Sequence, residues 1–174
     1  MTSNAERYKE LLIDFASNGE LDLGQLRRLL DGLEPNVVRG PGGHSDLSAP
    51  LGSTEELPLL ADVSKALAVI ETDDPAHPWN LGAVLFRAGR YLDAANEYLV
   101  AAGRFRQDAE AGTGSTGDED DWAQTSLYHA ARSFLRAGMP ISAAAVSTRM
   151  NGAERTEVLR ELRANVTRRA AENK

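Results

Sequence analysis

The sequence contains no cysteine among its 174 residues. Disulfide bonds, thiolate metal sites, iron–sulfur clusters and cysteine nucleophiles are therefore excluded. Aromatic residues make up only 6% of the chain, which is little for a surface that stacks on bases or sugars. No apolar run approaches the ~20 residues of a membrane-spanning helix, and the N-terminus lacks the basic start and apolar stretch of a signal peptide. We therefore expect a soluble, cytoplasmic protein with no membrane contact.

Basic residues are also in deficit. The chain has 19 Lys and Arg against 26 Asp and Glu, a formal net charge of −7. An excess of acid argues against general binding to nucleic acid or anionic lipid. Hydrophobic residues make up 42% of the chain, which is enough for the core of one domain or of two small ones. The composition therefore predicts a folded acidic protein and specifies no activity.

Strand patterns are absent, because no run of Val, Ile, Thr and aromatic residues alternates with polar residues between turn residues. Helical spacing instead predicts two N-terminal helices at about 4–17 and 22–33, with Asp22 as the N-cap of the second. Six more helices are expected at about 57–72, 76–88, 91–107, 121–137, 140–150 and 152–171. We therefore expect an all-α protein built from antiparallel helical hairpins.

The pattern divides the chain into three parts. Residues 1–35 are predicted to form an N-terminal helical hairpin, and residues 57–174 a helical array. Residues 36–56 are dense in Gly, Pro and Ser and have no periodicity, which indicates a flexible linker or a long loop. Whether this segment separates two helical units or covers a surface is left open. Within the array, residues 108–120 are rich in acids and are predicted to form an inserted acidic loop.

The most specific pattern is a set of small and large apolar residues around Gly89. The matching positions are Leu81, Gly82, Leu85, Gly89, Tyr91, Ala94, Tyr98 and Ala101. Leu81 and Leu85 would face a second helix, while Gly82 and Ala94 would let the two backbones approach closely. Gly89 permits the turn between the helices, and Tyr98 fills the space beside them. In order and spacing this set resembles the tetratricopeptide repeat, a helix–turn–helix unit.

A weaker copy of the pattern lies downstream. Ala130, Ala131, Phe134, Pro140 and Ala143 have the same offsets from Gly138. The two glycines are further apart than the family period of about 34 residues, and loop 108–120 accounts for the excess. Pro140 and Ser147 stand where aromatic residues are expected. The resemblance covers roughly residues 57–150 and implies a short tetratricopeptide-like α-solenoid, with helix 152–171 as its polar cap.

The resemblance implies a protein–protein interaction module or adaptor that binds a partner segment in a concave groove. Equal offsets from the two turn glycines select the residues of that groove: Trp79, Ala83, Phe86, Arg87, Tyr128, Arg132, Leu135 and Arg136. Arginines in an acidic protein would suit an acidic peptide or a C-terminal carboxylate.

Two alternatives stay open. In the first, Trp79 packs against helix 57–72 and the arginines pair with the acidic loop. In the second, the array is a structural subunit that packs into a larger assembly or against another copy of itself, because fold alone does not decide function.

Catalytic and metal-binding patterns are weak. Residues 112–117 match the letters of a dinucleotide-binding loop, but no strand precedes them and four acids follow. Those acids, residues 118–121, lack the alternate spacing of a calcium loop and are better placed to cap a helix. His44, His77 and His129 form no closely spaced pair. We therefore predict a protein that is not an enzyme, with no catalytic residue, metal or cofactor.

Overall fold

The computed structural model describes residues 2–33, 56–114 and 117–172. Over these residues the chain forms eight α-helices and no strand, which confirms the all-α prediction. The helices are α1 (Asn4–Asn18), α2 (Leu23–Leu33), α3 (Leu57–Ile70), α4 (Ala76–Arg87), α5 (Tyr91–Ala111), α6 (Glu119–Arg136), α7 (Pro140–Ser147) and α8 (Gly152–Glu172). The predicted linker 36–56, apart from Glu56, lies outside the described residues. None of the described helices is both long and apolar enough to cross a bilayer.

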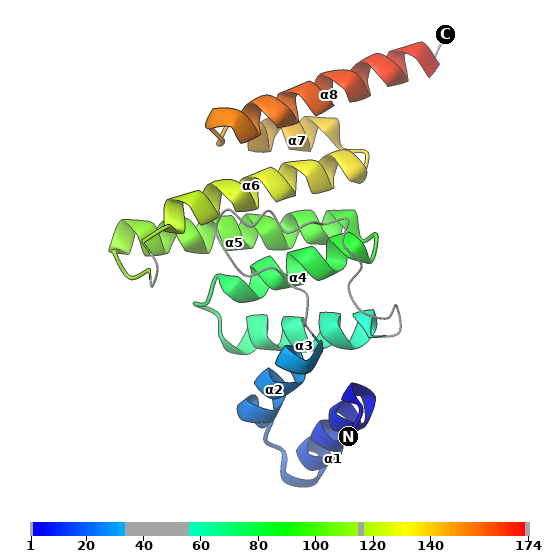
Figure 1. Ribbon diagram of the computed structural model, residues 1–174, viewed down its shortest axis with the longest axis vertical. Coiled ribbons are helices and arrows are strands. Elements are labelled where there is room, and N and C mark those ends of the chain that lie inside the picture. The colour runs from blue at the N-terminus through cyan, green and yellow to red at the C-terminus, as the bar shows by residue number, and fades with distance from the viewer. Residues whose placement is uncertain (1, 34–55, 115–116, 173–174) are drawn as a thin grey trace.

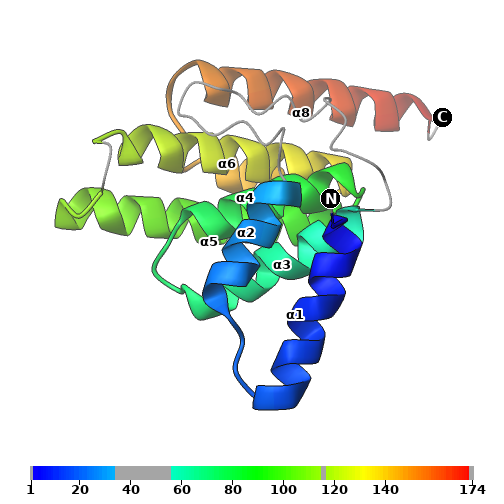
Figure 2. The ribbon, with the colours of Figure 1, turned by 60° about the horizontal axis from the view of Figure 1, so that its bottom comes forward.

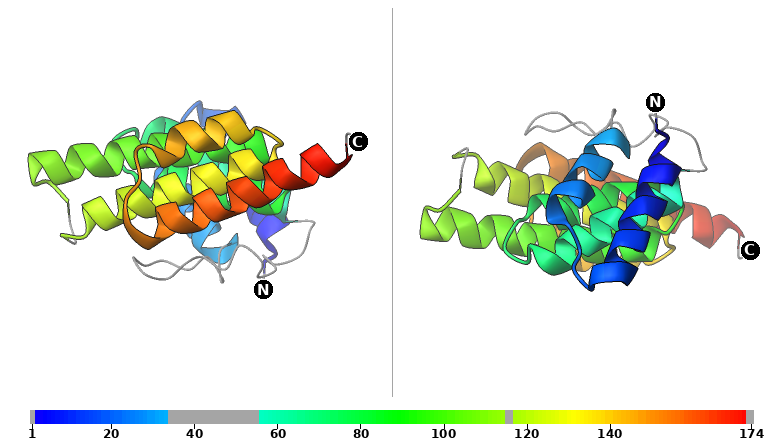
Figure 3. Two further views of the ribbon diagram at one scale, coloured as in Figure 1. Left: turned by 90° about the horizontal axis from the view of Figure 1, so that it is seen from above. Right: turned by 90° about the horizontal axis from the view of Figure 1, so that it is seen from below.

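The helices follow one another along the long axis of the molecule, from α1 at one end to α8 at the other (Figure 1). Each helix packs mainly on its neighbours in sequence, and α6 also packs on α8. The first two helices cross the α3 end of the stack (Figure 2), and α7 and α8 cover its opposite end (Figure 3). The molecule is therefore a stack of helical hairpins.

The α4–α5 and α6–α7 hairpins close in the same way. Gly89 has a φ of +75° and Gly138 a φ of +77°, a region that favours glycine. The residue after each glycine donates its backbone N–H to a carbonyl five residues earlier, as in a Schellman motif. These bonds join Arg90 to Leu85 at 2.9 Å and Met139 to Phe134 at 2.8 Å. The predicted equivalence of the two turns is thus confirmed in the backbone.

The close approach of α4 and α5 depends on Gly82. A Cβ atom at this position would lie 3.0 Å from three ring carbons of Tyr98, closer than ordinary van der Waals contact. Tyr98 itself is fully buried, and so is Ala94 on the same face of α5. The packing roles predicted for Gly82 and Tyr98 are therefore confirmed.

The N-terminal hairpin packs on the α3 end of the stack. The predicted N-cap is present, since the Asp22 carboxylate accepts a hydrogen bond of 3.0 Å from the Gln25 N–H. Leucines of α1 and α2 share one core with α3 and one residue of α4: Leu11, Leu26, Leu29, Leu30, Leu33, Leu60, Val63, Leu67 and Val84. A second core extends from α4 to α8. The hairpin is therefore continuous with the array.

Two predicted boundaries were wrong. Helix α5 continues to Ala111 and α6 begins at Glu119, so residues 108–111 and 119–120 of the predicted loop 108–120 are helical. Alanines at 109 and 111 favour helix, and Gly112, at a φ of +64°, ends it. Helix α7 ends at Ser147 and not at 150, because the next three residues form tighter bonds to carbonyls three residues back.

Candidate functional site

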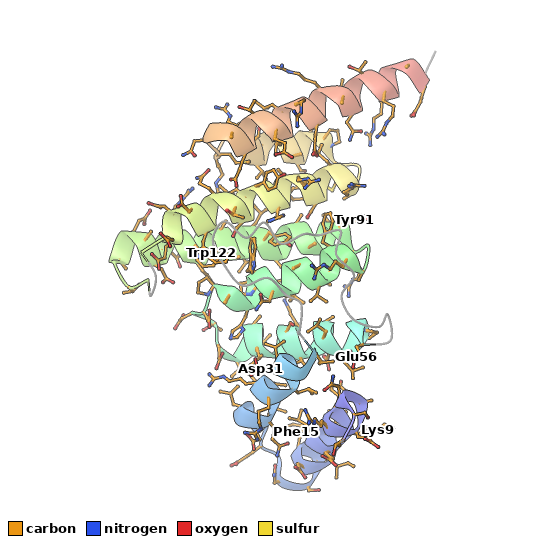
Figure 4. The ribbon with its side chains drawn as sticks, viewed as in Figure 1. Lys9, Phe15, Asp31, Glu56, Tyr91 and Trp122 are labelled. Atoms are coloured by element: carbon orange, nitrogen blue, oxygen red, sulfur yellow. The ribbon has the colours of Figure 1, made fainter. Side chains whose placement is uncertain are left out.

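A cleft of about 1020 Å³ opens where α2, the α3–α4 turn, the end of α5 and the start of α6 meet. Six carboxylate residues line it: Asp31, Glu71, Asp73, Asp74, Asp108 and Glu119. Figure 4 labels two of the lining residues that are far apart in the sequence, Asp31 on α2 and Trp122 on α6. Elements that are distant in sequence therefore supply one acidic surface.

The cleft also has an aromatic wall, which consists of Trp79, Phe105 and Trp122. The Trp122 ring stacks on Phe105 at 5.4 Å and meets Trp79 edge-on at 5.3 Å. Trp79 and Phe105 belong to the buried core, whereas Trp122 is half-buried. Trp122 therefore carries the apolar surface of the core out to the cleft, where a ring face can attract a cation.

Cationic side chains in the cleft are fewer than the acids. Arg27 forms an ion pair with Glu71, and His77 is the other basic residue in the lining. Arg104 approaches the edge and donates a hydrogen bond of 3.1 Å to the backbone carbonyl of Asp74. Carboxylates gathered against low-dielectric walls focus a negative potential. The cleft is therefore suited to a positively charged ligand.

Glu71, Asp74 and His77 lie together where α3 ends and α4 begins. The Asp74 N–H donates to the Glu71 carbonyl at 3.3 Å, and one Asp74 carboxylate oxygen accepts the Ala76 N–H at 2.8 Å. The His77 Nε2 contacts the Glu71 carboxylate and lies 3.6 Å from the other Asp74 oxygen. Burial lowers the pKa of His77, opposed by Asp74 and assisted by Arg27 and Arg104.

The eight residues predicted to line a groove occupy mixed positions. Trp79, Ala83, Tyr128 and Leu135 are buried, Phe86, Arg87 and Arg132 are half-buried, and Arg136 is exposed. Trp79, which the alternative interpretation packs on helix 57–72, makes ring contacts with Tyr98, Trp122 and His129 on α5 and α6. Partner binding at these eight residues stays a prediction, and the four buried residues offer a partner little surface.

Part of this set joins α6 to α8. The Tyr128 hydroxyl donates to the Glu157 carboxylate at 2.8 Å, and Arg132 lies 3.5 Å from the Glu161 carboxylate. Arg132 also donates to the Tyr128 hydroxyl at 3.3 Å and lies over its ring. Burial, with the bond to Glu157, raises the pKa of Tyr128 to about 12. This network gives Tyr128 and Arg132 a structural role.

The cleft was not predicted from the sequence. Its acids come from separate segments, and only Glu71, Asp74 and His77 left a local signal, a spacing of three residues within one turn. The spacing of His77 from the other histidines does not indicate this cluster, whereas its spacing from Glu71 and Asp74 does. Comparison of this chain with known family models, with curated proteins and with solved structures finds no match.

Proposed function

We propose that this protein is a non-catalytic protein-binding module, and that its acidic cleft binds a basic segment of the partner. The observation that carries the proposal is the cleft itself, which six acidic and three aromatic residues line together. Arginine and lysine match both features, because each combines a charged head with an apolar stem. Their guanidinium or ammonium groups also interact favourably with tryptophan rings.

We further propose that the array is tetratricopeptide-like. Support comes from the stacked hairpins and from the equivalent turns at Gly89 and Gly138. The proposed ligand charge, however, is opposite to that inferred from the predicted groove. Arg132 already pairs with Glu161, whereas the carboxylates of the cleft outnumber its one arginine. Basic ligands are therefore favoured over acidic ones.

Binding of a fluorescently labelled arginine-rich peptide, followed by anisotropy, tests this function. The double variant Asp73→Asn with Asp108→Asn removes two charges from the cleft and keeps the side-chain shapes. We expect about tenfold weaker binding, since two shielded charge pairs of ~0.7 kcal/mol each sum to that factor. The matched control, Glu10→Gln with Glu172→Gln, removes the same charge from exposed positions on α1 and α8. It should change the affinity by less than about twofold.

Two outcomes would overturn the proposal. Equal weakening by both double variants would mean that the peptide responds only to the net charge of the protein. Binding of a glutamate-rich peptide in preference to the arginine-rich one would favour the predicted groove of arginines instead.

A further inference from the structure

We propose that Glu71, Asp74 and His77 bind a divalent transition-metal ion, with zinc as the best-matched probe. Each of the three residues offers one ligand atom, and these atoms all lie within 4.8 Å of one another. The three residues stand at intervals of three between the end of α3 and the first turn of α4. This inference goes beyond the proposed binding of a basic segment and does not depend on it.

The distances between the ligand atoms are close to those of a metal site. Zinc binds nitrogen and oxygen at about 2.0–2.2 Å, which separates neighbouring ligands in a tetrahedron by roughly 3.3–3.5 Å. The His77 Nε2 already lies 3.6 Å from the Asp74 oxygen. Its contact with the Glu71 carboxylate is closer, so a small rotation of Glu71 would admit the ion.

The fold holds these ligands before any ion arrives. His77 is buried in the first turn of α4, with its Nε2 directed at both carboxylates. Asp74 is fixed by the bond from the Ala76 N–H to its other oxygen, an orienting contact of the kind that supports metal ligands. Glu71 follows the last residue of α3, and its N–H donates to Leu67 at 2.8 Å. Little further ordering of the three side chains is needed.

The charges and donor types define the class of ion. Two carboxylates balance a divalent charge, and one imidazole favours zinc, copper, iron or nickel over magnesium and calcium, which prefer oxygen alone. Arg27 pairs with Glu71, but its side chain is 58% exposed and can turn into solvent when the ion binds. The residues also line the cleft, so a fourth ligand position would face its interior.

Calorimetric titration of the full chain with zinc chloride, after treatment with a chelator, tests the site. We expect one zinc site, with affinity reduced by ~10-fold or more in His77→Gln and in Asp74→Asn. The matched control Asp73→Asn removes an equal charge from the same cleft but no ligand, and should change zinc affinity by less than about threefold. The second control, His44→Gln, removes an imidazole from outside the triad and should leave binding unchanged.

A second measurement keeps the test valid if a variant fails to fold. In the wild-type protein, zinc should shift the imidazole resonances of one histidine, and sequential assignment of the labelled wild-type protein should identify this histidine as His77. An unshifted His77, equal weakening by Asp73→Asn, or magnesium bound as tightly as zinc would overturn the proposal. If the protein binds zinc but not the arginine-rich peptide, only the proposed function is overturned. If it binds the peptide but not zinc, only the metal site is overturned.

Discussion

Replacement of Trp79 by alanine is expected to lower the free energy of unfolding by about 3–5 kcal/mol. The indole is only 3% exposed, and its ring lies 5.1–5.3 Å from the rings of Tyr98, Trp122 and His129. Truncation would therefore leave a cavity where α4, α5 and α6 meet. Unfolding in guanidinium chloride, followed by circular dichroism, measures the loss.

The control for Trp79 is its neighbour in the aromatic wall. Trp122→Ala removes a side chain of the same size from a half-buried position, and should destabilise the protein less. A smaller loss in Trp79→Ala than in Trp122→Ala would contradict the placement of Trp79 in the core. That result would instead support the prediction that Trp79 lines the groove.

Substitution of Tyr98 should give the second large effect on the free energy of unfolding. The direction of the change should depend on the residue introduced. Tyr98→Ala is expected to cost about 3–5 kcal/mol, because the ring is fully buried between Gly82 and His129. Tyr98→Phe should be neutral or stabilise by up to ~1 kcal/mol, since burying a hydroxyl without a partner is costly. Among the described residues, the Tyr98 hydroxyl has no hydrogen-bond partner.

The same denaturation experiment measures both variants of Tyr98. A phenylalanine variant that is less stable than the wild type by more than about 1 kcal/mol would contradict this prediction. It would mean that the hydroxyl makes a bond that stabilises the fold.

Helices and turns were largely predictable from the sequence because their signals are local. Asp22 caps the helix that its spacing indicated, and Gly89 and Gly138 close equivalent turns. The end of α5 was not predicted, because the acids at 108 and 110 indicate a loop although the alanines at 109 and 111 favour helix.

The surface was far less predictable. The predicted groove rests on residue offsets within two helices. Such offsets contain no information on which other helices pack over these two. Helix α8 lies on α6 and engages Tyr128 and Arg132 through Glu157 and Glu161. The acidic cleft was not predictable for a different reason. Asp31, Asp108 and its other acids are distant in the sequence and approach one another only in the folded chain.

A nuclear magnetic resonance titration of isotope-labelled protein with the arginine-rich peptide tests the cleft most directly. The largest shifts are predicted at the indole N–H of Trp122 and at the backbone amides of residues 71–74, 76–77 and 108–114, with α1 and α8 little changed. Shifts centred instead on Arg87, Arg132 and Arg136, or on α8, would contradict the cleft as the binding surface.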